Sequence, residues 1–94
     1  MTEDRQSLYV RVSGRVQGVN FRVWTRTEAR RLGLAGWVRN EDDGSVTALI
    51  VGPDKAVASM LERLWHGPAA ATVTSVETDV APLAAVPQDF RIAD

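Results

Sequence analysis

The chain has 94 residues, 45% of them hydrophobic, and a formal net charge of −1 at pH 7. This size supports one hydrophobic core, so we expect a single domain over residues 1–94. The small net charge, with Lys55 as the sole lysine, argues against a nucleic-acid partner, and the lack of cysteine excludes disulfides and thiolate nucleophiles. No apolar run approaches the length of a membrane span, so we expect a cytoplasmic protein without a membrane partner.

The pattern of apolar residues predicts five strands and two helices. Alternating apolar and polar residues are typical of half-buried strands, and apolar residues at helical spacing indicate amphipathic helices. Clusters of glycine, proline and aspartate mark the turns between them. The predicted elements are, in chain order, a strand over 8–14, a helix over 21–32, strands over 35–40 and 45–51, a helix over 54–66, and strands over 73–80 and 90–92.

This order of elements is that of the split β-α-β, or ferredoxin-like, arrangement. We therefore expect an α+β sandwich, in which two helices cover one face of a mainly antiparallel sheet that ends in an additional short strand. In this topology the first and second strands run parallel with the third between them, so their C-terminal ends reach the same edge. Gly14 and Asn40 should then lie close together, with Asn40 on the helix side of the sheet.

The segment between the first strand and the first helix has the features of an anion-binding loop. Its glycines, Gly14 and Gly18, allow the backbone to turn N–H groups inward, and the helix start adds unpaired donors and a partial positive charge. Arg22 lies at the start of the predicted helix, where the helix dipole disfavours a cation. A bound anion beside Arg22 would offset this unfavourable placement. The expected phosphate-binding groups are Arg22 and the backbone N–H groups of Arg15, Val16, Gln17, Gly18, Val19 and Asn20.

Other phosphate chemistries require residues that this chain lacks. A cysteine phosphatase needs a thiolate six residues before its arginine, where this sequence has Val16. Nucleotide P-loops need Gly-Lys-Ser or Gly-Lys-Thr, and dinucleotide sites need Gly-x-Gly-x-x-Gly; neither is present. Asp42 and Asp43 more commonly cap a turn than bind a metal. We therefore expect neither a metal nor a cofactor.

Two motifs give the chain a resemblance to the acylphosphatase family that extends over nearly its whole length. They are Gly14-x-Val16-Gln17-Gly18-Val19-x-Phe21-Arg22, and Gly36-Trp37-Val38-Arg39-Asn40 followed by Asp43-Gly44-x-Val46. The resemblance implies a metal-independent hydrolase that converts acyl phosphates into a carboxylate and inorganic phosphate. It also implies that Arg22 holds the phosphoryl group and that Asn40 places the attacking water.

Elementary chemistry is compatible with these roles. Backbone N–H groups and a planar guanidinium suit the three phosphoryl oxygens, and the uncharged Asn40 orients water without repelling a dianion. No His, Asp or Glu lies within the two motifs. We therefore hypothesise that the water's proton passes to a phosphoryl oxygen of the substrate, so that the rate shows no enzyme pKa between about pH 5 and 8.

Asn20, Glu41 and the C-terminal segment Phe90-Arg91-Ile92-Ala93-Asp94, which lacks a basic-aromatic close, depart from the family pattern, and two other functions remain open. We expect Asn20 to cap the first helix and Glu41 to point away from the phosphate. A non-catalytic module that senses phosphate or another anion would keep the same loop without turnover. An RNA-binding domain would share the element order, but the aromatic strand motif and basic surface are missing. The size and the lack of an obvious exposed apolar stripe make a monomer the expected state.

Overall fold

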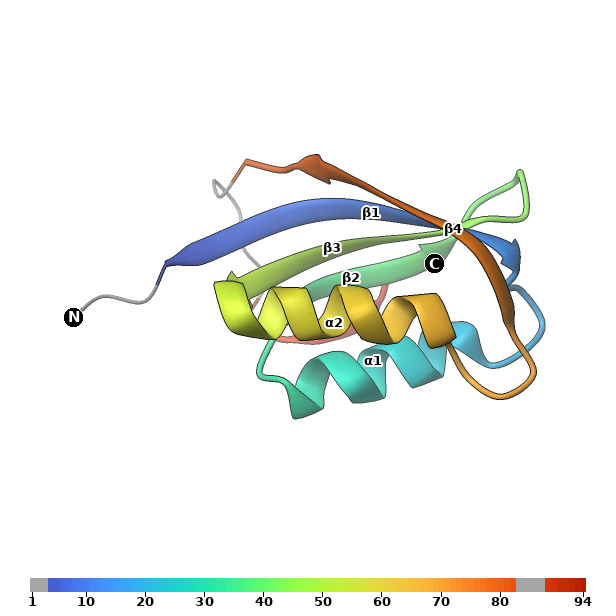
Figure 1. Cartoon of the computed structure of the whole chain (residues 1–94), viewed down its shortest axis with the longest axis horizontal. Helices are drawn as coiled ribbons and strands as arrows, with labels where there is room; N and C mark the ends of the chain where they lie inside the picture. Colours follow the sequence, from blue (N-terminus) through green and yellow to red (C-terminus); the bar gives the residue numbers. More distant parts are fainter. Residues whose placement is uncertain (1–3, 83–87) are drawn as a thin grey trace.

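Five strands and two helices form the computed structural model, which describes residues 4–82 and 88–94 (Figure 1). The first unit of the fold runs from a long strand through a helix into a second strand, and the same order then repeats. The elements are β1 (Arg5–Arg15), α1 (Phe21–Arg31), β2 (Ala35–Asn40), β3 (Val46–Pro53), α2 (Asp54–His66), β4 (Thr72–Val80) and β5 (Phe90–Ile92).

The strands lie in one sheet in the order β4-β1-β3-β2-β5. Strand β3 is antiparallel to both β1 and β2, so β1 and β2 run parallel and end at the same edge of the sheet. Strand β5 pairs in parallel with the outer side of β2. This arrangement confirms the predicted ferredoxin-like α+β fold with its additional short strand.

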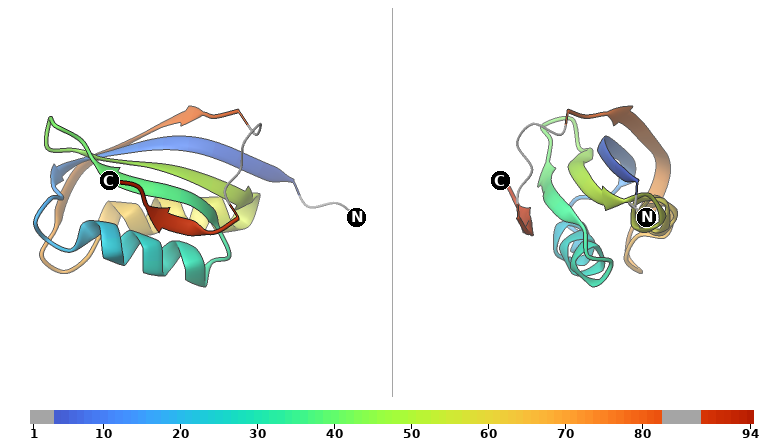
Figure 2. Two further views of the ribbon diagram at one scale, coloured as in Figure 1. Left: turned by 180° about the vertical axis from the view of Figure 1, so that it is seen from behind. Right: turned by 90° about the vertical axis from the view of Figure 1, so that its left-hand side faces the viewer.

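Both helices cover the same face of the sheet, and within residues 4–82 and 88–94 the opposite face carries no helix (Figure 2). The core lies between the two layers, where side chains of one parity from the strands meet the apolar sides of the helices. Fully buried members include Val10, Val38, Ile50, Phe21, Met60 and Phe90. Burying a side chain of this kind contributes about 1.5 to 3 kcal/mol to stability relative to leaving it exposed. The packing of the helices on the sheet therefore holds the strand ends in place.

The boundaries of the elements differ from the predictions by a few residues. Strand β1 begins at Arg5 rather than at Leu8, because it pairs with β3 as far as Pro53 even where its own side chains are polar. Helix α1 ends at Arg31, one residue early, and Leu32 is its C-cap. Most of the connector predicted between the last two strands, residues 83–87, lies outside the described residues.

Candidate active site

The β1–α1 loop (residues 16–20) begins where β1 ends. Gly14 lies in the preceding strand at φ 120°, and a Cβ atom there would collide with the carbonyl oxygen of Thr72 in β4. Gly18 has φ 73° and Asn20 has φ 68°, while Val19 between them does not have a positive φ. Alternation of this kind turns successive N–H groups toward one side and creates a concave surface that suits an anion.

The donors of this loop have no protein acceptor. In the described part of the chain, no backbone N–H group of residues 16–20 donates in the hydrogen bonds of loops, turns and caps. The start of α1 is adjacent, and its first turn contains no acidic residue. Unpaired N–H groups and the positive end of the helix dipole therefore share one surface, which favours an anionic ligand.

A cavity of about 180 Å³ lies between this loop, the start of α1 and the end of β2. Five predicted site residues line it, which are Val16, Gly18, Asn20, Arg22 and Asn40, together with Phe21, Val23 and Ile92. Arg15 instead pairs with Thr72 in the sheet, and Val19 packs against the core. The structure thus gathers the loop, the arginine and the asparagine in one place, as the topology predicts, while Arg15, Gln17 and Val19 do not line the cavity.

Asn40 has a buried oxygen without a partner. Its side-chain Oδ1 is inaccessible and receives no hydrogen bond from any described residue. A buried acceptor of this kind usually has a partner, and leaving it unpaired costs about 1 to 3 kcal/mol. Asn40 lines the same cavity as Arg22, and its buried oxygen meets a water or ligand held there only after the side chain turns.

Asp94 connects the two residues to which the sequence assigns catalysis. Its carboxylate accepts a hydrogen bond from Nη1 of Arg22 at 2.6 Å and one from the backbone N–H of Asn40 at 3.0 Å. These two donors hold the pKa of the Asp94 carboxyl below its usual range, the Asn40 N–H having the larger effect. The sequence reasoning did not identify Asp94, although the register of β5 beside β2 extends from Val38 and Ile92 to Asn40 and Asp94.

Comparisons with known proteins agree with this geometry. The family model described as Acylphosphatase matches residues 8–92. An acylphosphatase from Rhizobium etli is 61% identical over 92 residues, which cover 98% of each chain. The chain belongs to the acylphosphatase family. This finding confirms the predicted family and enzyme class.

Solved acylphosphatase structures share the fold at lower identity. The acylphosphatase from Coxiella burnetii superposes with a TM-score of 0.90 at 36% identity, covering 96% of this chain and 94% of that one. The acylphosphatase from Bacillus subtilis also gives a TM-score of 0.90 at 36% identity, covering 94% of this chain and 98% of that one. The arrangement of loop, helix and strand ends is therefore one that acylphosphatases share.

Gln17 ties the β1–α1 loop to the hairpin that follows Asn40. Its Nε2 donates to the carbonyl oxygens of Glu41 at 2.8 Å and Ser45 at 2.9 Å. The backbone N–H of Glu41 also donates to Ser45 O, which closes the hairpin at this point. The sequence predicts a backbone role for Gln17, whereas the structure shows that its side chain connects the two motifs of this acylphosphatase.

Asn20 corrects one prediction. It occupies the N-cap position of α1, but its side chain makes no capping hydrogen bond. A capping side chain requires an extended backbone, whereas Asn20 is left-handed, at φ 68° and ψ 24°. Asparagine tolerates this conformation better than most residues, so Asn20 is suited to the turn of the loop rather than to capping.

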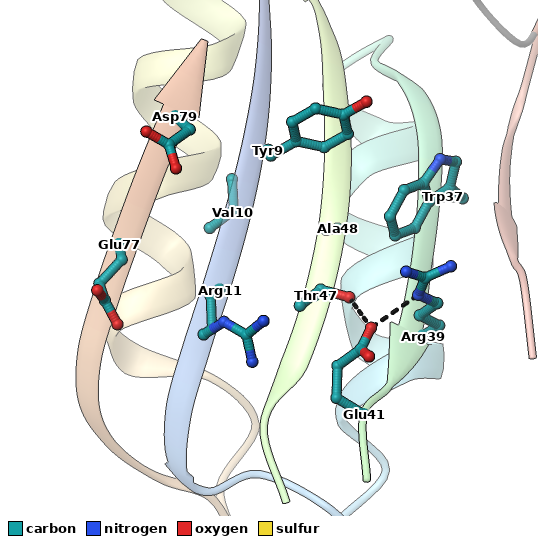
Figure 3. A pocket seen from close by; sticks show the side chains of 10 residues that line it. All are labelled: Tyr9, Val10, Arg11, Trp37, Arg39, Glu41, Thr47, Ala48, Glu77 and Asp79. Carbon is teal, nitrogen blue, oxygen red and sulfur yellow. Dashed lines mark hydrogen bonds and ion pairs between the residues drawn. The ribbon is translucent and has the colours of Figure 1, made fainter. Parts of the chain in front are cut away.

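Glu41 points away from the β1–α1 loop, as predicted. Its carboxylate lies on the open face of the sheet, where it accepts hydrogen bonds from Thr47 and Arg39 (Figure 3). These contacts, with the Thr47 hydroxyl first, hold the pKa of Glu41 below its usual range. The negative charge is therefore paired and faces a second cavity on the other side of the sheet from Asn40.

The described residues form neither a cluster of metal ligands nor a helix that could span a membrane. Within residues 4–82 and 88–94, no three His, Cys, Asp or Glu side chains come together as a metal site would require. Neither helix of the described chain combines the length and apolarity that a membrane crossing needs. Independence from metals and cofactors stays a prediction for this acylphosphatase, which a chelator experiment can test.

Proposed function

We propose that this acylphosphatase hydrolyses the carboxyl-phosphate bond of acyl phosphates, with Arg22 and the β1–α1 loop binding the phosphoryl group and Asn40 orienting the attacking water. The observation that supports it best is the convergence of Arg22, Asn40 and the β1–α1 loop on one cavity. A binding site for phosphate alone has no need of the uncharged Asn40 beside these donors. A site that holds a water against phosphorus does.

The binding step relies on fixed donors. The free N–H groups of residues 16–20 contact phosphoryl oxygens, and the guanidinium of Arg22 adds charge-assisted hydrogen bonds. Nη1 of Arg22 is engaged by Asp94, so its Nε and Nη2 donors are assigned to the phosphoryl group. Since charge builds on these oxygens in the transition state, donors that are already in place lower the barrier.

The chemical step needs orientation more than acid–base strength. Asn40 Oδ1 accepts a hydrogen bond from water and aligns its oxygen with phosphorus, opposite the acyl oxygen. The new P–O bond forms from water, the bond to the acyl oxygen breaks, and the carboxylate leaves with the bonding pair. The proton of the water passes to a phosphoryl oxygen, which accounts for the products, a carboxylate and inorganic phosphate.

Asp94 acts as a positioning residue in this scheme. Its two hydrogen bonds fix the guanidinium of Arg22 and the backbone of Asn40 in relation to one another. The carboxylate is ionised throughout the neutral range, because its pKa lies below the usual value of about 3.9. We further propose that the chain folds as a single domain over residues 1–94 and acts as a cytoplasmic monomer on small acyl phosphates, without a nucleic-acid or membrane partner.

The decisive assay is hydrolysis of benzoyl phosphate in excess EDTA, followed together with binding of inorganic phosphate. Rapid turnover that EDTA does not reduce supports the proposed enzyme. Saturable phosphate binding by folded protein without turnover would instead indicate the anion-sensing module. A turnover that EDTA abolishes and Mg²⁺ restores would overturn the metal-independent mechanism.

A further inference from the structure

Strand β5 brings Asp94 to the cavity, although β5 is the shortest of the described strands and lies at the edge of the sheet. It has three residues, and among the described residues it pairs with β2 alone. One further hydrogen bond extends the pairing at each end, from the Gly36 N–H to Asp89 O at 3.0 Å and from the Ala93 N–H to Val38 O at 2.9 Å. So few hydrogen bonds barely offset the entropy lost in ordering the strand. Other contacts are therefore needed to keep β5 attached.

Helix α1 lies beside β5 and forms an ion pair with each end of this segment (Figure 2). At the cavity, Nη1 of Arg22 lies 2.6 Å from the carboxylate of Asp94. At the opposite end, Nη2 of Arg30 lies 2.9 Å from the carboxylate of Asp89. The two arginines are eight residues apart on α1, which corresponds to about 12 Å along the helix axis. The first ion pair belongs to the candidate active site, whereas the second lies outside it.

Arg30 holds the start of β5 through both a side chain and the main chain. Its Nη2 donates to Asp89 Oδ2 at 2.9 Å, and its Nε donates to Asp89 Oδ1 at 3.2 Å and to the carbonyl oxygen of Phe90 at 3.0 Å. Asp89 Oδ1 also accepts the N–H of Phe90 at 2.7 Å. These donors, the Phe90 N–H first and Arg30 second, hold the pKa of the Asp89 carboxyl below its usual range. Because the guanidinium fork reaches the backbone as well, it restrains β5 more than a simple surface ion pair would.

The side chains of β5 allow it one register beside β2. Phe90 is 0% exposed and belongs to the core, whereas the next residue, Arg91, is exposed. A shift by one residue would exchange these two side chains and bury a charge, which is strongly unfavourable. The alternative to the attached strand is therefore a detached one, in which Asp94 leaves Arg22. Contacts that keep β5 attached, those of Arg30 among them, also keep Asp94 in place.

We propose that Arg30 is a positioning residue for hydrolysis, which acts through β5 and Asp94 on Arg22 near the other end of α1. The inference rests on the proposed function, in which Asp94 fixes the guanidinium of Arg22. Arg30 is not among the described residues that line the cavity, so it does not touch the substrate. Its removal should therefore cost no more activity than the loss of the Asp94 contact does.

The kinetic test is a double-mutant cycle of Arg30→Met and Asp94→Asn in benzoyl phosphate hydrolysis. Arg30→Met keeps an aliphatic side chain without the fork, and should lower kcat/KM by about twofold to fivefold because β5 is detached in part of the molecules. In the Asp94→Asn background the same change should have no further effect, since the link to Arg22 is already weakened. An unchanged kcat/KM in Arg30→Met, or losses that multiply in the double variant, would overturn the proposal.

The matched control is Arg31→Met, which removes the same charge from the next residue of α1. Arg31 is exposed and forms an ion pair with Glu28 at 3.7 Å, so this variant should keep the kcat/KM of the parent. Arg30→Lys keeps the charge without the fork, and its kcat/KM should lie between those of Arg30→Met and the parent. Equal losses in Arg30→Met and Arg31→Met would reduce the effect to one of general charge and contradict the proposal.

A measurement without substrate separates this inference from the proposed function. The backbone N–H of Asn40 donates to Asp94, so its amide chemical shift reports whether β5 is attached. Arg30→Met should move this signal part of the way toward its position in Asp94→Asn and speed hydrogen exchange of the Ala93 N–H, whereas Arg31→Met should change neither. Turnover in the parent with an unmoved Asn40 signal in folded Arg30→Met would overturn this inference alone. A folded parent without turnover would overturn the proposed function and this inference together.

Discussion

Two cavities of this molecule each contain arginines that are paired with carboxylates, Arg22 with Asp94 at the strand ends, and Arg11 with Asp43 and Arg39 with Glu41 on the open face. They differ in their other polar groups. At the strand ends, the backbone donors of residues 16–20 have no acceptor among the described residues, whereas the open face adds the carboxylates of Glu77 and Asp79. The larger cavity therefore suits an anionic substrate less well, although it has more than twice the volume of the smaller one.

In the proposed mechanism, free backbone donors rather than cavity size mark the end of the fold that binds the phosphoryl group. Because the arginines of both cavities are paired, the free N–H groups at the start of α1 are the feature that distinguishes the strand ends as a site for an anion. Substitutions at corresponding positions of the two cavities test this difference directly.

Removing an arginine should have the largest effect, and only at the strand ends. Arg22→Ala should weaken phosphate binding by about 2 to 5 kcal/mol and lower kcat/KM by about 10²- to 10³-fold, because the developing charge loses a fixed donor. Arg11→Ala on the open face is the matched control and should keep both values. Isothermal titration with inorganic phosphate and benzoyl phosphate kinetics measure the pair. Equal effects of the two changes would remove the distinction between the cavities.

Disturbing the contact between loop and hairpin should have the next largest effect. Gln17→Glu places a carboxylate against the carbonyl oxygens of Glu41 and Ser45, and should lower kcat/KM by about tenfold to a hundredfold. Gln6→Glu makes the same change at an exposed position near the start of β1 and should leave kinetics unchanged. Steady-state kinetics and the thermal midpoint of each variant test this. Unaltered kinetics in a folded Gln17→Glu variant would show that the hydrogen bonds of Gln17 to the hairpin do not position the β1–α1 loop.

Neutralising Asp94 should have a smaller effect with a distinctive pH dependence. Asp94→Asn keeps the shape but weakens the bond to Arg22, and should lower kcat/KM by about threefold to tenfold. In the parent, activity should be flat from about pH 5 to 8 and fall in acid, as the carboxylate with its lowered pKa becomes protonated. The Asp94→Asn variant should lack the part of this fall in activity that comes from protonation of Asp94. An identical pH profile in both proteins would exclude Asp94 as its source.

Changing the open face should have the smallest effect. Glu41→Gln removes a paired carboxylate and should alter benzoyl phosphate kinetics by less than about twofold, with only a small change in stability at pH 7. Because the pKa of Glu41 is lowered on folding, its stabilisation is present above its unfolded pKa of about 4.3 and is lost as pH falls through the folded value. Urea unfolding at pH 7 and in acid should therefore show a smaller acid loss in the variant. A large kinetic effect would mean that the two faces are coupled.

The fold and the meeting of the two motifs could be predicted because they depend on patterns with a fixed period. Alternating residues define the strands, helical spacing defines α1, and the split β-α-β order then requires the β1–α1 loop and Asn40 to lie at one edge. These constraints tolerate small errors in the ends of elements. A strand that begins at Arg5 instead of Leu8 still ends beside the same loop.

The contacts of individual polar side chains could not be predicted in the same way. Asp94 reaches Arg22 only because the three-residue strand β5 adopts one register beside β2. Gln17 and Glu41 turn to partners that come together after the hairpin closes. Asn20 has a left-handed backbone, and this conformation is not compatible with a side-chain hydrogen bond that caps α1. Each depends on tertiary geometry that no local sequence pattern specifies.

The central claim is that Asn40 serves the chemical step and the β1–α1 loop serves binding. The most direct test compares the parent with Asn40→Ala in benzoyl phosphate hydrolysis, with competitive inhibition by inorganic phosphate measured in the same experiment. The account predicts that kcat falls by about 10²-fold or more while the inhibition constant for phosphate stays within about twofold, because only the water loses its orientation. A parallel loss of phosphate affinity, or a kcat that Asn40→Ala leaves unchanged, would contradict it.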